Sequence, residues 1–140
     1  LPKNLLSYVS YCEDDMDKMV HLVCYLDSLQ TSANKKIIIF TNTIKASKLV
    51  SNTLSLLRYN SVVLHANMQQ RQRLSKLEKF SVNVCYALIC SGLAARGLDM
   101  IVDVVIQFGV PINGDTYVHR LGRTARAGRT GEGIIFISKK

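Results

Sequence analysis

Short apolar runs rich in β-branched residues alternate with amphipathic stretches along this sequence. The run Lys36–Phe40 is apolar at every position from Ile37 onward, as expected for a strand that is buried on both of its faces. Alternation of strands with helices implies a parallel sheet, because each crossover helix returns the chain to the same end of the sheet. We therefore predict a single α/β domain, a parallel sheet with helices on both faces.

The expected elements follow from the period of the apolar positions. Strands are expected at Leu5–Tyr11, Lys36–Phe40, Ser61–His65, Cys85–Cys90, Val104–Phe108 and Gly133–Ile137. Helices are expected at Asp14–Leu29, Ile44–Leu57, Gln69–Phe80 and from about Asp115 to Arg123, with Thr43 capping the second. The inward positions are predicted to be Met19, Val20, Val23, Leu26 and Leu29 in the first helix and Leu74, Leu77 and Phe80 in the third. Ligands of such sheets bind where the strands end, so the loops after these strands are the candidate sites.

The net charge of the chain indicates the class of molecule that it binds. Eighteen lysines and arginines oppose ten acidic residues, which leaves a net charge of +8 and favours a polyanion such as nucleic acid or nucleotide. No apolar run reaches the roughly 18–20 residues of a membrane span, so no membrane partner is expected. The four cysteines include no C-x-x-C pair, which argues against a metal or redox site. We expect reduced, mostly buried thiols of an intracellular protein.

The densest cluster of cations is the segment His119–Arg129, which holds four arginines and one histidine. Arg120, Arg123 and Arg126 are spaced three apart, so on a helical turn their guanidinium groups lie on one side. Guanidinium groups bind phosphate oxygens in bidentate geometry, and a polyphosphate would relieve the repulsion among them. The alternative is a solvated basic helix end.

Two further segments follow expected strands. Ser91–Asp99 opens with small residues, which let backbone N–H groups approach a phosphate closely, and Asp99 could accept a bond from a sugar hydroxyl. Gln70 and Arg73 lie three apart at the start of a helix, where a backbone phosphate could bind. Both segments also have a purely structural interpretation. Ser91–Asp99 could be a structural glycine turn, and the turn with Gln70 and Arg73 could be an exposed polar turn of a helix.

Taken in order, these segments resemble motifs of the C-terminal RecA-like domain of DEAD-box RNA helicases. Residues 37–43 resemble motif IV, Gln70-x-x-Arg73 motif IVa, Ser91–Asp99 motif V and His119–Arg126 motif VI. The resemblance extends from about Leu5 to Ile137. The runs Leu64–Leu74 and Tyr117–Gly128 are similar to members linked to large ribosomal subunit assembly, which implies a nuclear or nucleolar location.

The resemblance implies that residues 1–140 form one RecA-like domain of a longer protein. This domain would be the second motor of an ATP-dependent RNA helicase, a hydrolase that remodels RNA duplexes or ribonucleoproteins. The chain has no G-x-x-x-x-G-K-[S/T] and no Asp-Glu-Ala-Asp, which in the family belong to an N-terminal RecA-like domain. That domain would bind ATP phosphates and Mg²⁺, so the chain alone is expected to be inactive.

The resemblance also implies roles for individual residues. Arg126 would be the arginine finger on the γ-phosphate, with Arg123 beside it, while Asp99 and Gly97 would line the ATP ribose site. The RNA backbone would contact Thr43, Gln70, Arg73, Ser91 and Gly92, without reading base identity. Contacts between the two motor domains would involve Arg96, His119 and Arg120.

Three positions depart from the family pattern. Ser91-Gly92 stands where Thr-Asp is usual, so the hydroxyl is kept and a carboxylate is lost. Ala125 and Ala66 each replace a common glycine.

Three other classes of function fit the sequence less well. A stand-alone RNA-binding module would use the arginines for RNA only. A DNA translocase would need other motifs near Phe40 and Gln70, and a dinucleotide-dependent enzyme would need a G-x-G-x-x-G that the chain lacks.

Overall fold

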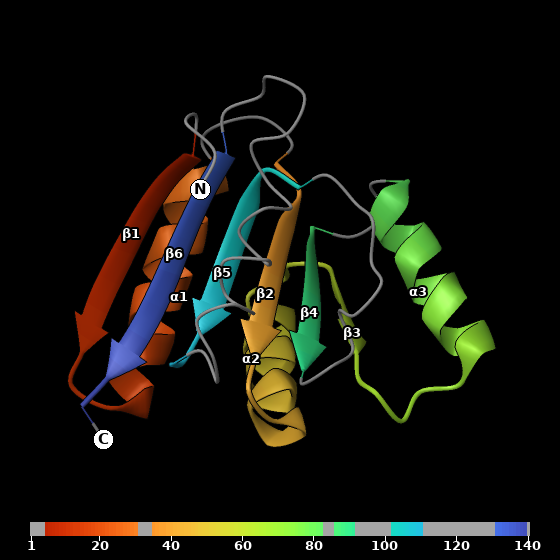
Figure 1. The fold of residues 1–140 in the computed structure, drawn as a ribbon, viewed down its shortest axis with the longest axis horizontal. Helices are drawn as coiled ribbons and strands as arrows, with labels where there is room; N and C mark the ends of the chain where they lie inside the picture. Colours follow the sequence, from red (N-terminus) through yellow and green to blue (C-terminus); the bar gives the residue numbers. More distant parts are fainter. Residues whose placement is uncertain (1–4, 31–34, 83–85, 92–101, 111–130, 140) are drawn as a thin grey trace.

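The computed structural model describes residues 5–30, 35–82, 86–91, 102–110 and 131–139, which form a parallel sheet with three packed helices (Figure 1). The strands are β1 (Leu5–Cys12), β2 (Ile37–Thr41), β3 (Ser61–Leu64), β4 (Ala87–Ser91), β5 (Val104–Phe108) and β6 (Gly131–Ser138). The helices are α1 (Asp15–Gln30), α2 (Ile44–Leu56) and α3 (Gln70–Ser81). The predicted α/β class is confirmed, and the predicted elements in the described residues are correct to within about two residues at each end.

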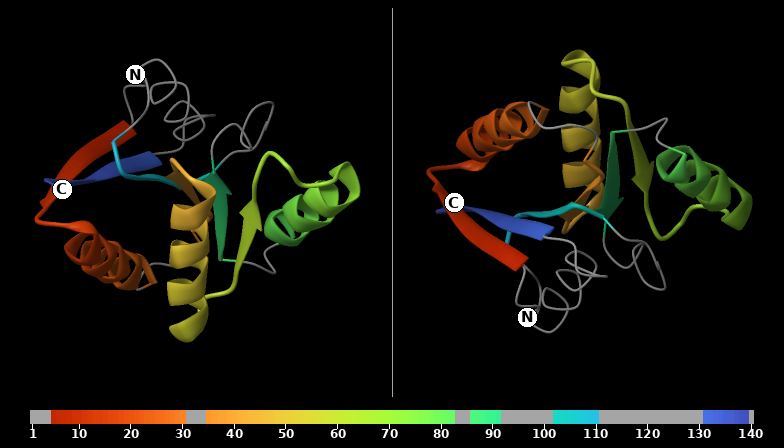
Figure 2. Two further views of the ribbon diagram at one scale, coloured as in Figure 1. Left: turned by 90° about the horizontal axis from the view of Figure 1, so that it is seen from below. Right: turned by 90° about the horizontal axis from the view of Figure 1, so that it is seen from above.

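The sheet has the strand order β1-β6-β5-β2-β4-β3, and every neighbouring pair is parallel. Strand β2 lies in the interior between β4 and β5, and all five of its residues are buried, as its unbroken apolar run indicates. Helices α1 and α2 lie side by side on one face (Figure 2). Helix α3 packs on the opposite face, so the prediction of helices on both faces is also confirmed.

The two faces of the sheet carry separate apolar cores, because alternate strand residues point to opposite sides. Ile37 and Ile39 of β2 pack with α1 and α2, while Ile38 and Phe40 pack with Phe80 of α3. Each face of β2 is therefore covered by a different part of the chain.

The predicted inward face of α1 is partly wrong. Val20 is 52% exposed, whereas Leu22, which the periodicity did not select, is completely buried together with Leu26. Val20 borders an apolar groove beside the end of α2, together with Met19 and Val23. Met19 is partly buried and packs against the core, as predicted. Apolar residues on both sides of the helix made two faces compatible with the sequence, and packing against the sheet selected one.

In α3 the predicted face is also only partly correct. Phe80 is buried and Leu77 packs beside it, but Leu74 is 56% exposed. The helix touches the sheet mainly through β3, and its first turns extend beyond that edge strand (Figure 1). Leu74 therefore has no apolar layer beneath it in the described part of the chain.

The cysteines are free, as predicted, in the residues that the structure describes. Cys12 and Cys90 are buried, whereas Cys24 is exposed on α1. Cys85 and the helix predicted at residues 115–123 lie outside the described residues. None of the helices in the described ranges is long and apolar enough to cross a membrane.

Two tyrosine hydroxyls link helix α1 to other parts of the chain through hydrogen bonds. Tyr25 donates a hydrogen bond to Glu132 of β6, and Tyr59 donates one to Asp27 of α1. Burial, and then the bond to Asp27, raises the pKa of Tyr59 to about 12. Burial and the bond to Glu132 also raise the pKa of Tyr25. Both hydroxyls therefore stay protonated at neutral pH and act as donors.

Candidate functional site

The carboxyl ends of three interior strands lie level at one edge of the sheet. In the strand register Thr41 of β2 is paired with Ser91 of β4 on one side and with Phe108 of β5 on the other. Leu64 of β3 is paired with Cys90, one residue before the end of β4. The carboxyl ends of these strands therefore lie at the same edge of the sheet (Figure 1).

Thr43 caps helix α2 at this edge, as predicted. Its side-chain oxygen accepts a hydrogen bond from the Ala46 N–H at 3.0 Å, and the Thr41 hydroxyl donates to the Thr43 carbonyl at 3.1 Å. The cap uses a lone pair of Thr43 Oγ1, so the hydroxyl proton remains able to donate to an external acceptor. The exposed side chain of Thr43 is thus held in place by local structure.

Gln70 and Arg73 lie in the first turn of α3. Gln70 is exposed and Arg73 is half-buried, and the Arg73 N–H closes the first helical hydrogen bond to the Gln69 carbonyl at 2.9 Å. Gln69, at the N-cap position, makes no capping bond with its side chain. The first N–H groups of the helix can therefore bind an anion beside the Arg73 guanidinium.

Ser91 ends β4 with a buried hydroxyl. Its side chain is 2% exposed, and its Oγ has no hydrogen-bond partner among the residues that the structure describes. Burying a hydroxyl without a partner costs about 1–3 kcal/mol. The group is therefore a candidate donor for a ligand at this edge.

A polar network that the sequence analysis missed joins the ends of β2 and β5. Gln107 donates to Asn42 Oδ1 at 3.4 Å, and Asn42 Nδ2 donates to the Val110 carbonyl at 2.7 Å. Between them Gly109 has a φ of +108°, and a Cβ there would lie 3.2 Å from Asn42 Nδ2. The turn therefore requires glycine, and it places Val110 beside the end of β2. The glycine that directly follows the buried strand ending at Phe108 is the sequence signal that could have indicated this turn.

A pocket of about 170 Å³ between α2, β3 and α3 was also not predicted. Its lining includes Lys48, Lys76 and His65, and Lys76 donates to the Val63 carbonyl at 3.1 Å. The Nδ1 of His65 is buried without a hydrogen-bond partner in the described part of the chain. Lys76 follows Arg73 by three residues, so the helical spacing could have placed both cations on one side of α3.

The other predicted site residues lie outside the described residues. They are Gly92, Arg96, Gly97, Asp99, His119, Arg120, Arg123 and Arg126. The structure therefore brings the strand of motif IV and the strand that ends at the start of motif V to one edge, with Thr43 and Ser91 beside it, and places Gln70 and Arg73 at the start of α3.

Comparison with known proteins agrees with this arrangement. Residues 17–128 match the family described as helicase conserved C-terminal domain. The chain is 43% identical over 106 residues to the ATP-dependent rRNA helicase RRP3 of Candida albicans, which covers 75% of the chain and 20% of that relative. The chain thus spans about a fifth of the length of this relative.

Two solved structures have the same fold. The yeast DEAD-box splicing factor Prp28 superposes with a TM-score of 0.88 at 29% identity, covering 99% of this chain and 30% of that chain. Domain 2 of the DEAD-box helicase Mss116p, solved bound to an RNA duplex, superposes with a TM-score of 0.81 at 28% identity, covering 97% of this chain and 55% of that chain.

Proposed function

The chain belongs to the DEAD-box RNA helicase family, in which it is a conserved C-terminal RecA-like domain, and we propose that it is the second motor domain of an RNA-dependent ATPase. In this role it supplies an arginine finger and contacts to the RNA backbone. The hydrolysis of ATP then drives the remodelling of RNA duplexes or of RNA–protein complexes.

The observation that carries the proposal is the alignment of strand ends in the register Thr41–Ser91. It brings the loop that carries Thr43 beside the end of β4, where the buried Ser91 hydroxyl has no hydrogen-bond partner among the described residues. An RNA backbone laid across this edge would meet the exposed Thr43 hydroxyl, a helix N-terminus and the Arg73 guanidinium, with the Ser91 hydroxyl beneath. Phosphate oxygens accept hydrogen bonds from all of these groups.

Phosphoryl transfer needs a metal ion, a cradle for the phosphates and an arginine finger in one place. In the proposed function Arg126 and Arg123 stabilise the charge on the γ-phosphate, while Asp99 and Gly97 hold the ribose. Arg96, His119 and Arg120 couple the two motor domains. The phosphate cradle and the ligands of Mg²⁺ come from an N-terminal RecA-like domain of the same protein.

The RNA contacts in this proposal are independent of base sequence, because they go to the backbone. A substrate class is suggested by RRP3, which is named as an rRNA helicase. We accordingly place the protein in ribosome assembly, with ribosomal precursor RNA as its substrate and the nucleolus as its location.

The test of the proposed function compares the chain alone with the protein that also contains the N-terminal domain. We expect no ATP hydrolysis by the chain alone and RNA-stimulated hydrolysis when the two domains are joined, because only then are the cradle and the finger together. Phosphate release with and without RNA measures this. Binding of RNA with no effect of RNA on ATP turnover in the joined protein would instead favour an RNA-binding module.

Replacing Arg73 by alanine in the joined protein should weaken the binding of all RNA sequences about equally. It should also make the plot of log affinity against log salt concentration shallower by about 0.7, the change expected for one lost contact to a single-strand phosphate. Fluorescence titrations of several RNA sequences at several salt concentrations measure both effects.

Arg71→Ala is the matched control for this experiment. Arg71 carries the same charge two residues earlier on α3 and is exposed. Its replacement should leave the slope nearly unchanged. Equal slopes for Arg73→Ala and the parent protein, with equal affinities, would remove Arg73 from the RNA site.

A further inference from the structure

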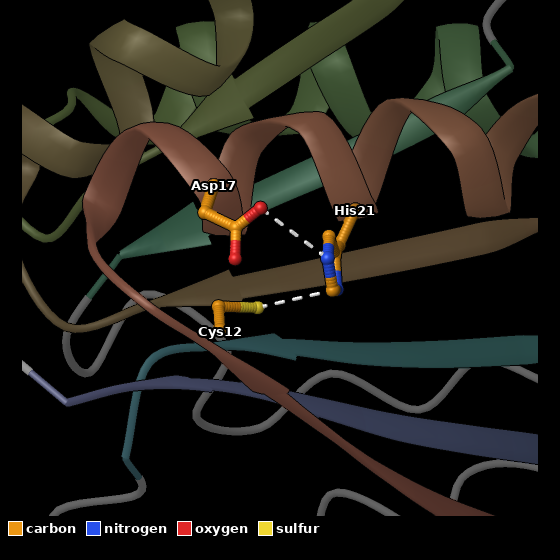
Figure 3. A group of neighbouring side chains, drawn as sticks. All are labelled: Cys12, Asp17 and His21. Carbon is orange, nitrogen blue, oxygen red and sulfur yellow. Dashed lines mark hydrogen bonds and ion pairs between the residues drawn. The ribbon is translucent and has the colours of Figure 1, made fainter.

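Cys12, Asp17 and His21 converge where the last residue of β1 meets the first turns of α1 (Figure 3). One ligand atom from each side chain lies within 4.8 Å of the other two. From this geometry we propose that Cys12 and His21 bind a single zinc-like transition-metal ion, and that Asp17 orients the imidazole. The absence of a C-x-x-C pair argued against a metal site, but a group of one cysteine, one aspartate and one histidine contains no such pair.

The spacing of the two ligand atoms fits one shared ion. Cys12 Sγ lies 3.4 Å from His21 Nδ1. A tetrahedral zinc ion with Zn–S of about 2.3 Å and Zn–N of about 2.0–2.1 Å separates its sulfur and nitrogen ligands by about 3.5 Å. An ion can therefore bridge these two atoms with little movement of either side chain.

The second nitrogen of the imidazole already has the partner that metal-binding histidines use. Asp17 Oδ1 lies 3.4 Å from His21 Nε2, and the other carboxylate oxygen of Asp17 accepts a hydrogen bond from the Glu13 N–H at 2.9 Å. A carboxylate that accepts the Nε2 proton leaves the lone pair on Nδ1, the nitrogen that Ser10 Oγ and Cys12 Sγ both contact. In Figure 3 Asp17 and Cys12 lie on the same side of the imidazole, and each contacts one of its nitrogens.

The remaining coordination positions have an oxygen donor and access to solvent. Ser10 Oγ lies 2.9 Å from the same His21 Nδ1 and can act as a weak third ligand. Cys12 is 2% exposed, but the His21 side chain is 39% exposed, so water can complete the shell. A thiolate and an imidazole favour Zn²⁺ and Co²⁺ over Mg²⁺ and Ca²⁺, which prefer oxygen ligands.

Metal binding has to displace the thiol proton. Burial raises the pKa of Cys12, the hydrogen bond to Ser10 lowers it, and the charge of Asp17 raises it further against an opposing effect of Lys18. Other charged groups near the site are Asp14, whose carboxylate accepts a hydrogen bond from the Asp17 N–H, and Asp15, which pairs with Lys18. Glu13 forms an ion pair at 3.4 Å with Lys139, just after β6. Cys12 therefore enters the site as a thiol and should release one proton when the ion binds.

The site would connect an edge strand to the helix that follows it. Among the described strands, β1 is an edge strand that pairs with β6 along its whole length, and the Cys12 carbonyl accepts a hydrogen bond from the Lys139 N–H at 3.2 Å. An ion shared by Cys12 and His21 adds a link between β1 and α1 that exists only in the folded state. Zn²⁺ should consequently raise the melting temperature of the chain.

A titration of the reduced, metal-free chain with Co²⁺ tests the proposal. We expect one ion per chain, a near-ultraviolet thiolate-to-cobalt charge-transfer absorption, and displacement of Co²⁺ by Zn²⁺. Cys12→Ser and His21→Ala should each abolish the absorption. Asp17→Ala should weaken Co²⁺ binding by roughly 10–100-fold, as for other partners of metal-binding histidines, and Asp17→Asn by less.

Cys24→Ser is the matched control, because Cys24 is a free thiol on the same helix and is exposed. It should leave the absorption unchanged. His21→Ala alters a partly exposed side chain, so it gives an answer even if Cys12→Ser does not fold. The proposal is overturned if the parent chain shows no thiolate-to-cobalt absorption, if that absorption survives either ligand replacement, or if Cys24→Ser removes it.

Discussion

Replacing Arg126 by alanine in the joined protein should lower RNA-stimulated ATP turnover by about 10³-fold or more, the scale of other arginine fingers. The guanidinium group would stabilise charge on the γ-phosphate only as the transition state forms. Turnover should therefore fall much more than ATP binding, and single-turnover hydrolysis together with nucleotide titration separates the two.

Two further replacements sharpen this test. Arg126→Lys keeps the charge but loses the planar guanidinium, so it should recover little of the activity. Arg129→Ala removes the same charge three residues later, where no role is assigned, and should keep turnover near that of the parent. An Arg126→Ala protein that turns over ATP within a few fold of the parent would exclude Arg126 as the finger.

Replacing Asp99 by alanine in the same protein should weaken ATP binding by about 1–2 kcal/mol, the effect of a lost hydrogen bond to a charged group. This corresponds to roughly 5–30-fold in the dissociation constant. The physical reason is that a carboxylate accepts the ribose hydroxyl bond more strongly than the water that would replace it. Equilibrium titration with a fluorescent ATP analogue measures the change.

A deoxy analogue decides whether Asp99 contacts the sugar. If it does, 3′-deoxy-ATP should bind the parent protein more weakly than ATP, and Asp99→Ala should remove most of that difference. Asp99→Asn, which keeps an uncharged acceptor, should lie between the two. An equal loss for ATP and 3′-deoxy-ATP on replacement of Asp99 would show that it does not contact the 3′ hydroxyl.

The fold was predictable where a pattern has only one structural solution. The unbroken apolar run of β2 is compatible only with a strand covered on both faces, and the structure covers it with α1 and α2 on one side and α3 on the other. Thr43 was predictable as a cap because its hydroxyl satisfies an N–H that the helix start leaves open. The family was predictable because four motifs occur in the expected order.

The parts of the site that could not be predicted depend on contacts between distant segments. Asn42 and Val110 are joined by a hydrogen bond across 68 positions, and only the pairing of β2 with β5 makes that bond possible. The burial of the Ser91 hydroxyl, which has no hydrogen-bond partner among the described residues, likewise depends on the position of β4 between β2 and β3. The roles of Asp99 and the arginines remain predictions, because these residues lie outside the described ranges.

The sequence by itself determined the class of fold, the alternation of elements and the family, because the periods of strands and helices are local properties of the chain. Tertiary structure decided which side of a helix is buried, because α1 carries apolar residues on two sides and packing selected Leu22 over Val20. Tertiary structure also brings the Cys12 thiol into contact with the His21 imidazole, because the turn from β1 into α1 sets the distance between the two side chains. The local period of apolar residues specifies where helices and strands form. The way in which these helices and strands pack against one another specifies which side chains come into contact.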